Sequence, residues 1–265
     1  MLNEVAVTLS GKEIERLGHR LRACTAPDPA DIALLGELLI RYNGAMTQVA
    51  DGLRSIGLAA TTRLKSTGTI VDKLKRTASS NLRAIRDLAG ARVVRRMTLD
   101  EQDGLVAQVK GIWPSAEVVD RRTRPSHGYR AVHVIPKVDG CKVEIQIRTI
   151  YQDVWAQTME LFGDLWGRDV RYGGPPSTPD AQYVSGLTRA EVVTSWIKYA
   201  DQLHRLAEVE NELAVYDARG DRDHERAVEL RRVVETDLAP LQAHVQQLAD
   251  VLEERRLGGT GTVTP

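Results

Sequence analysis

The sequence predicts an α+β protein in which a β-sheet is preceded and followed by helices. Three observations support this fold class. Residues 143–149 alternate apolar and polar side chains without interruption, which is the period of a β-strand. A second run rich in β-formers, residues 130–135, is joined to it through Asp139-Gly140, a dipeptide typical of tight hairpins. Residues 1–60 and 188–256 instead carry apolar side chains at helical spacing.

The predicted hairpin sets a register between its two strands. If Asp139-Gly140 form the loop, Val138 lies opposite Cys141 and His133 lies opposite Gln146. Opposed residues share a face, so a polar set projects together and an apolar set forms the core side. A solvated sheet face is the alternative interpretation of the polar set. The polar set is Tyr129, His133, Glu144, Gln146 and Arg148, and the apolar set is Val132, Val134, Val143, Ile145 and Ile147.

Composition limits the class of protein and its partners. The chain has 265 residues, of which 42% are hydrophobic and 27% charged, as expected for one large or two small globular domains. Lys plus Arg equals Asp plus Glu at 36 each. Residues 61–96 hold ten basic and two acidic residues, a net charge of +8, whereas residues 187–257 hold ten and fifteen, a net charge of −5. A basic middle in a neutral chain favours a small polyphosphate over duplex DNA.

Cysteines and hydropathy indicate the setting of the protein. Cys24 and Cys141 make no disulfide framework, which favours a reducing cytoplasm. Apolar runs are too short to span a membrane, and the first residues lack the pattern of a signal peptide. We therefore expect a cytoplasmic protein without a membrane partner.

A basic segment at residues 63–76 is a candidate phosphate site. If Ser66 or Thr67 caps a helix there, Thr69, Lys73 and Arg76 share one face. Helix N-termini and cations both favour anions, so this face suits a triphosphate. The alternative is a solvated basic helix, and a Walker loop is absent from the sequence. The residues expected to face the core are Ile70 and Leu74.

Asp87 is the carboxylate that stands out in this basic region. It lies in residues 85–94, which lead from a helix end through Asp-x-x-Gly into a β-branched strand. Asp87 could simply pair with Arg83 or Arg86. Magnesium beside phosphates, however, is held by one or two carboxylates, and Glu144 could be the second.

Four motifs together carry a resemblance to a known family. They are R-x-K-S-x-x-T-I-x-x-K-x-x-R from Arg63, D-x-x-G-x-R from Asp87, G-Y-R-x-x-H from Gly128 and E-I-Q-I-R-T from Glu144. In this order and at these separations they resemble the synthetase domain of the RelA/SpoT alarmone synthetases over residues 61–172. The resemblance implies a mixed-sheet, nucleotidyltransferase-like core. It also implies transfer of pyrophosphate from ATP to the 3′-hydroxyl of GDP or GTP, making (p)ppGpp.

The resemblance assigns roles to individual residues. It implies that Arg63 and Arg92 sandwich the adenine of ATP, and that Mg²⁺ is held by Asp87 and Glu144, with Glu144 also activating the acceptor hydroxyl. The residues implied for the ATP phosphates are Lys65, Thr69, Lys73 and Arg76. The residues implied for the acceptor are Arg124, Tyr129, His133, Gln146, Arg148 and Asp153, with Tyr129 stacking on the base.

Departures from the family pattern lie on the acceptor side. The run before Tyr129 has Arg124 where the family has lysine, and His127 is inserted. Residues 155–161 lack a histidine common in small alarmone synthetases, and Asp153 stands where an asparagine is usual. ATP use is therefore more strongly implied than acceptance of guanosine. The His-Asp dipeptide of the family's hydrolase domain is absent from the sequence, which indicates a synthetase-only chain.

We expect three regions along the chain: an N-terminal helical layer at 1–60, a synthetase core at 61–175 and a C-terminal helical region at 186–257. In the first region, one helix is predicted around residues 14–21 and a second after Asp28-Pro29, with an interruption at Asn43-Gly44. The last region should form two helices, at 188–217 and 221–256, with a kink near Pro240. Such helices could bind a second copy of the chain or an inhibitory protein partner.

Three functions are compatible with these patterns. The leading one is a synthetase of (p)ppGpp. The second keeps the ATP chemistry but transfers pyrophosphate to the 3′ end of tRNA, as the toxins of toxin–antitoxin pairs in this superfamily do, because Arg121, Arg122 and Arg124 would suit a phosphate backbone. The third is a non-catalytic nucleotide-binding protein, which the presence of both Asp87 and Glu144 disfavours.

Overall fold

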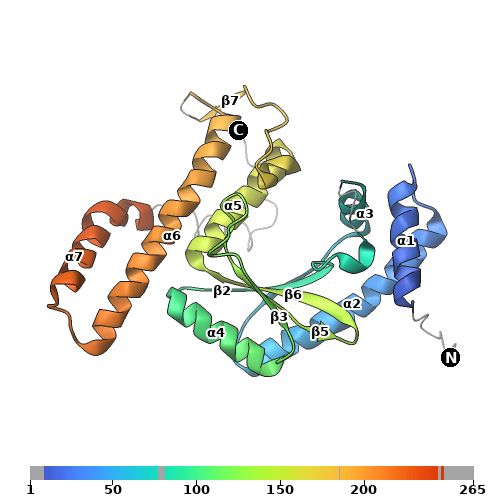
Figure 1. Cartoon of the computed structure of the whole chain (residues 1–265). Helices are drawn as coiled ribbons and strands as arrows, with labels where there is room; N and C mark the ends of the chain where they lie inside the picture. Colours follow the sequence, from blue (N-terminus) through green and yellow to red (C-terminus); the bar gives the residue numbers. More distant parts are fainter. Residues whose placement is uncertain (1–8, 77–80, 185, 244–245, 248–265) are drawn as a thin grey trace. The chain divides into compact units, whose positions relative to one another are not determined.

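The computed structural model describes residues 9–76, 81–184, 186–243 and 246–247. It confirms the α+β fold class, with a mixed sheet and long C-terminal helices (Figure 1). The chain divides into two compact units, each assembled from three segments of the chain. The first unit comprises Met1–Val93, Ala107–Val119 and His133–Gln146, and the second comprises Val94–Val106, Asp120–Val132 and Ile147–Pro265. The three predicted domains remain a prediction.

Two helices begin the first unit, as predicted. They are α1 (Gly11–Ala23) and α2 (Pro29–Ser55), and Asp28 caps α2 by accepting a hydrogen bond from the Ala30 amide at 2.7 Å. The predicted interruption at Asn43-Gly44 is wrong, because α2 continues through it. A glycine inside a helix costs only about 1 kcal/mol relative to alanine. Burial of the neighbouring Tyr42 and Met46 offsets this cost.

The central sheet follows these helices. Its strands run in the order β1-β2-β6-β4-β3, and β5 pairs with β6. In chain order the elements are β1 (Thr61–Leu64), α3 (Thr67–Arg76), η1 (Leu82–Ala84), β2 (Ala89–Arg95), β3 (Glu117–Asp120), β4 (Val132–Ile135), β5 (Lys137–Val138) and β6 (Cys141–Thr149). The strand expected from residue 130 thus begins at Val132.

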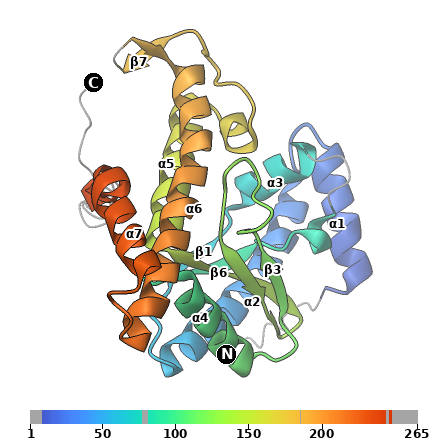
Figure 2. The same cartoon turned by 60° about the vertical axis from the view of Figure 1, so that its left-hand side comes forward.

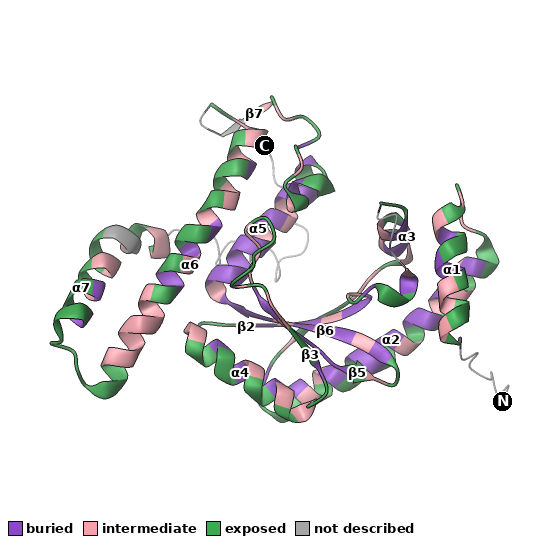
Figure 3. Cartoon of the chain, in the orientation of Figure 1, coloured by how far each residue is buried: buried purple, intermediate pink, exposed green. Residues whose placement is uncertain are grey.

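The predicted hairpin and its register are confirmed within the first unit. Val138 pairs with Cys141, and the Val143 amide donates to the Pro136 carbonyl at 3.1 Å. Asp139 and Gly140 have φ angles of 48° and 78°, as a two-residue hairpin turn of this kind requires. The apolar set is buried, and Figure 3 shows long stretches of β6 in purple. The interpretation of the polar set as a solvated sheet face is wrong, because the side chains of two of its members, His133 and Glu144, are only 11% and 12% exposed.

The second unit is mainly helical. Its elements are α5 (Ile150–Trp166), η2 (Arg168–Tyr172), β7 (Gln182–Val184), β8 (Leu187–Thr188), α6 (Arg189–Arg219), α7 (Glu225–Val233) and the π-turn η3 (Val234–Leu238), while α4 (Leu99–Ile112) has residues in both units. Helices α5 and α6 lie side by side (Figures 1 and 2). Their contact buries one stripe of α6: Val193, Ala200, Leu203, Leu206 and Ala207.

The two predicted C-terminal helices are present in the described residues. Helix α6 ends at Gly220, whose φ of 78° is the left-handed conformation that terminates helices. The π-helical turn η3 ends at Leu238, two positions before Pro240, near which the prediction placed a kink. Proline has no amide hydrogen for the preceding turn, so the helical hydrogen bonding must change there. The predicted continuation beyond residue 247 lies outside the described residues. Among those residues, no helix combines the length and apolar character that crossing a bilayer requires.

Candidate active site

A carboxylate held by two lysines is the centre of the site in the first unit. Asp87 precedes β2, and its two oxygens accept hydrogen bonds from Lys65 Nζ at 2.5 Å and Lys73 Nζ at 2.8 Å. Both lysines come from the predicted phosphate-binding segment. Pairing of Asp87 with Arg83 or Arg86 is wrong, because these arginines pair with glutamates elsewhere in the unit.

Helix α3 presents its charged face as the spacing predicted. Ser66 caps the helix, and its hydroxyl accepts a hydrogen bond from the Thr69 amide at 3.4 Å. Ile70 and Leu74 are fully buried, Thr69 and Lys73 are half-buried, and Arg76 is exposed. The burial of the apolar stripe fixes the rotation of α3 and therefore the direction in which Lys73 projects.

Glu144, the second of the two carboxylates predicted to hold Mg²⁺, also lies in the first unit. It lies on β6 and meets two polar neighbours, His133 Nδ1 at 3.1 Å from its Oε1 and Gln146 Nε2, which donates to its Oε2 at 2.9 Å. These three residues belong to the predicted polar set, so that part of the set is brought together as expected.

The environment keeps both carboxylates ionised. Burial acts to raise the pKa of Asp87, but the charges and hydrogen bonds of Lys65 and Lys73 outweigh it and the pKa is lowered. Burial also acts to raise the pKa of Glu144, and the hydrogen bond and charge of His133 lower it overall. Asp87 raises the pKa of Glu144 slightly. The two carboxylates therefore influence each other electrostatically.

Two arginines predicted for adenine lie on neighbouring strands. Strands β1 and β2 are antiparallel, with Arg63 opposite Gly90 and Thr61 opposite Arg92. Arg63 and Arg92 are thus diagonal neighbours on one face of the sheet. Such neighbours have side chains about 7–8 Å apart, which is roughly two van der Waals separations and leaves room for one flat ring.

The residues fit a magnesium ion that arrives with phosphates. No group of three or more His, Cys, Asp or Glu side chains in the described part of the chain could hold a metal ion by itself. Magnesium usually retains water and binds one or two carboxylates together with phosphate oxygens, and Asp87 and Glu144 supply two carboxylates. The oxygens of Asp87 accept hydrogen bonds from two lysines, and a polyphosphate would attract the same lysines.

The second unit contains the other predicted acceptor residues. Arg148 donates to the Tyr129 hydroxyl at 3.1 Å and to Asp153 at 2.9 Å. This part of the polar set is therefore also brought together. Arg124 is exposed on the loop that precedes Tyr129. The inserted His127 has a φ of 51° and contributes to the turn that closes this loop.

Arg122 corrects one interpretation of the sequence. Its guanidinium donates to Asp120 and Asp103 at 2.7 and 2.6 Å, and its side chain is only 13% exposed. The sequence groups Arg122 with Arg121 and Arg124 as residues that would suit a phosphate backbone. In the structure, the charge of Arg122 is instead taken up by the two aspartates. Asp120 lies two positions earlier, on the same face of an extended segment, so the sequence did contain a signal for this pair.

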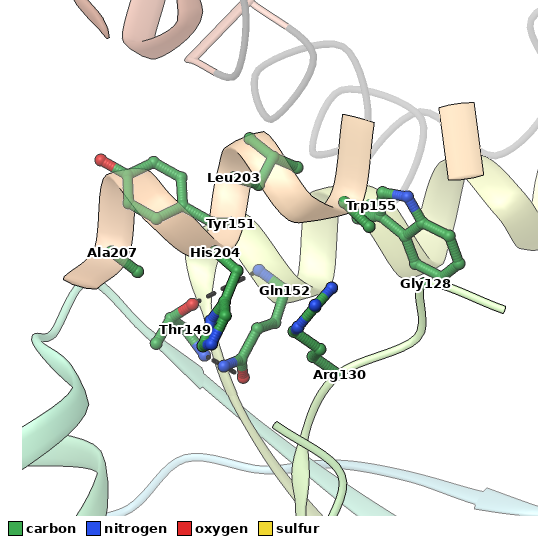
Figure 4. Close-up of a pocket in the computed structure, with 10 residues that line it drawn as sticks. Gly128, Arg130, Thr149, Tyr151, Gln152, Trp155, Leu203, His204 and Ala207 are labelled. Atoms are coloured by element: carbon green, nitrogen blue, oxygen red, sulfur yellow. Dashed lines mark hydrogen bonds between the residues drawn. The ribbon is translucent and has the colours of Figure 1, made fainter. Parts of the chain in front are cut away.

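Arg130 is a further residue of this region that the sequence interpretation missed. It donates to Asp201 of α6 at 2.8 Å and lines a cavity of about 20 Å³ in the second unit (Figure 4). Other residues of the lining include Thr149, Trp155 and His204. A space of this size suits about one or two water molecules and is too small for a nucleotide.

These features define the class of protein. Lys73 of α3 and Lys65 just before it hold a half-buried carboxylate, in a sheet-containing unit that also carries Glu144, and this arrangement is equipped to bind phosphates. The chain belongs to the RelA/SpoT family: residues 62–160 match the region found in RelA/SpoT proteins. The uncharacterized proteins Rv1366 of Mycobacterium tuberculosis and Mb1401 of Mycobacterium bovis are each 33% identical to it over 190 residues, covering 69% of this chain and 68% of the relative.

Solved structures also show similarity to the chain. Small alarmone synthetase 1 from Bacillus subtilis matches 71% of this chain and 97% of its own, with a TM-score of 0.49 and 19% identity. The structure of small alarmone synthetase 1 from Bacillus subtilis bound to AMPCPP matches 72% and 99%, with a TM-score of 0.45 and 18% identity. The family assignment rests on the sequence matches.

Proposed function

We propose that the protein is an ATP-dependent pyrophosphokinase that transfers pyrophosphate to the 3′-hydroxyl of GDP or GTP and makes (p)ppGpp. The observation that carries the proposal is Asp87 held between Lys65 and Lys73, within electrostatic influence of Glu144. This cluster lies in the segment that matches RelA/SpoT proteins. Families of one fold differ in chemistry, so the cluster and not the fold supports the reaction.

The ATP side of the reaction follows from charge. Lys65, just before α3, and Thr69, Lys73 and Arg76 along one face of the helix would bind the phosphates, and Arg63 and Arg92 would hold the adenine. Phosphate oxygens compete with Asp87 for the two lysines, so ATP binding would release the Asp87 oxygens. Asp87 and Glu144 would then hold Mg²⁺, which neutralises charge that develops on the transferred phosphates.

The transfer step needs positioning more than covalent catalysis. The 3′-oxygen bonds to the β-phosphorus of ATP, the bond between that phosphorus and the α–β bridging oxygen breaks, and AMP leaves. The hydroxyl proton passes to Glu144 and then to solvent. Because the pKa of Glu144 is lowered, this carboxylate is a weak base. We infer that it mainly orients the hydroxyl, with proton transfer completed as the new bond forms. Tyr129 would stack on the acceptor base.

Transfer of label from ATP tests this proposal. ATP labelled on its terminal two phosphates is offered GDP, GTP or uncharged tRNA in separate reactions, and each product is isolated. We expect label on GDP or GTP. Asp87→Asn and Glu144→Gln, both nearly isosteric, should each lower transfer by about a hundredfold or more.

A matched control keeps this result specific. Asp51→Asn removes an exposed carboxylate of the same unit that pairs with Arg54, and it should leave transfer unchanged. Label on tRNA alone would replace the proposal with the tRNA-modifying alternative. Retained transfer in both active-site variants would contradict the assignment of Asp87 and Glu144.

A further inference from the structure

The corner between β6 and α5 holds a buried charge. Arg148 is the penultimate residue of β6, and Thr149 caps α5 without an intervening loop. The Thr149 hydroxyl accepts from the Gln152 amide at 3.3 Å, while the Gln152 side chain accepts from the Thr149 amide at 3.2 Å. This reciprocal cap fixes the direction in which the helix leaves the strand. It thereby places Asp153, in the first turn of α5, beside Arg148.

Arg148 links this corner to Tyr129. Its Nη1 donates to Asp153 Oδ1 at 2.9 Å, and its Nη2 donates to the Tyr129 hydroxyl at 3.1 Å. The guanidinium carbon also lies 5.2 Å from the centre of the Tyr129 ring, within the range of a cation–π contact. One side chain therefore contacts both the polar end and the ring of Tyr129.

Burial determines what these two charged residues can touch. The Arg148 and Asp153 side chains are 2% and 9% exposed. A buried guanidinium without its anion is strongly unfavourable, so each charge requires the other. Burial acts to lower the pKa of Arg148, but Tyr129 and Asp153 raise it overall, so the arginine stays charged. The start of α5 favours the Asp153 carboxylate through the helix dipole.

We propose that Arg148 and Asp153 are positioning residues that hold the ring of Tyr129 for the acceptor base, and that neither contacts the acceptor itself. The acceptor part of this inference rests on the proposed function. A stacking ring that is held in place loses less entropy on binding than one that must be ordered. The buried ion pair supplies a fixed anchor for that ring, because the cap at Thr149 places both partners.

Fluorine NMR tests the positioning without any activity. The chain has 7 tyrosines, and incorporation of 3-fluorotyrosine gives each a signal; Tyr129→Phe identifies the signal of Tyr129. Asp153→Asn should shift and broaden that signal, because Arg148 loses its anion. The matched control is Asp201→Asn, which removes the exposed partner of Arg130, the next residue in the chain, and should move the signal much less. An unmoved Tyr129 signal in Asp153→Asn would overturn the inference.

Kinetics tests the consequence for the acceptor. Tyr129→Phe keeps the ring and the buried ion pair but removes the hydrogen bond between Arg148 and the Tyr129 hydroxyl. It therefore tests the inference even if Asp153→Asn does not fold. Both variants should raise the KM for GDP or GTP by about tenfold, the value of one hydrogen bond to a charged group, and leave the KM for ATP unchanged. The double variant should be no worse than either single variant, because both break one linkage.

Each kinetic outcome bears on the inference. A wild-type acceptor KM in Tyr129→Phe, or effects that simply add in the double variant, would show that Asp153 does not act through Tyr129. If the Tyr129 fluorine signal moves in Asp153→Asn but the wild-type chain transfers no pyrophosphate, the positioning is supported and the proposed function is contradicted.

Discussion

Asp87 determines the electrostatic environment of two lysines in the first unit. Its carboxylate lies between Lys65 and Lys73 and offsets part of the repulsion between these two cations. Polyphosphate can take over the same neutralising task. The lysines are thus held ready for an anion by a group that is itself a candidate metal ligand.

Removal of one of these lysines should weaken ATP binding. Lys73→Ala is expected to cost about 1–3 kcal/mol in ATP affinity, because one charge-assisted contact is lost. Calorimetric titration with ATP measures the effect. The control is Lys75→Ala on the same helix, whose ammonium donates to the Thr25 carbonyl at 3.3 Å and should contribute little. Unchanged ATP affinity in Lys73→Ala together with a lower melting temperature would indicate a purely structural role for this face of α3.

The lowered pKa of Asp87 also predicts how stability depends on pH. A carboxyl whose folded-state pKa is depressed adds stability above its unfolded-state pKa, and this contribution is lost as the pH falls through the folded-state pKa. Urea unfolding measured from about pH 6 down to about pH 2 should therefore show a steeper loss below about pH 4 in the wild type than in Asp87→Asn. Equal slopes would mean that the lysine contacts contribute nothing to the folded state.

The loop before Tyr129 is an element shaped by one glycine. Gly128 has a φ of 89°, and a Cβ there would lie 2.7 Å from Trp155 and 3.0 Å from Ala200 Cβ. The loop therefore packs directly on α5 and α6 in the second unit, which explains why no other residue suits this position.

Gly128→Ala tests that packing. We expect a loss of roughly 2–4 kcal/mol in the free energy of unfolding, from backbone strain and overpacking together, measured by urea denaturation. Gly57→Ala provides the control, since Gly57 has a φ of 75° but nothing within 4 Å of the added Cβ, and only the strain applies. Equal losses in the two variants would show that Gly128 does not hold the loop against the helices.

Local patterns predicted individual elements better than their interactions. The alternation in β6 and the Asp139-Gly140 turn depend on neighbours in sequence, and both are confirmed. The continuity of α2 through Asn43-Gly44 was not predictable in this way, since it depends on what the helix buries. The packing of α5 on α6 likewise depends on two apolar stripes far apart in the chain.

For the whole molecule, the distribution of charge is more informative than its sum. The net charge is zero, yet residues 61–96 carry a basic excess, and two of its lysines, Lys65 and Lys73, meet at Asp87 within one unit. The two compact units are each assembled from three chain segments. Hydropathy and linker composition report on contiguous segments only, so they do not reveal units whose strands come from several parts of the chain.

The amino-acid sequence established the α+β class, the hairpin register, the buried face of α3 and the motifs of the family, because each depends on spacing within a short segment. Tertiary structure decided the partners of the charged groups. Asp87 pairs with Lys65 and Lys73, although Arg83 and Arg86 are nearer in sequence. Arg122 pairs with Asp120 and Asp103. Arg148 is buried and pairs with Asp153. Ion pairs form between side chains that the fold brings within a few ångströms, and in a basic segment many partners are equally close in sequence.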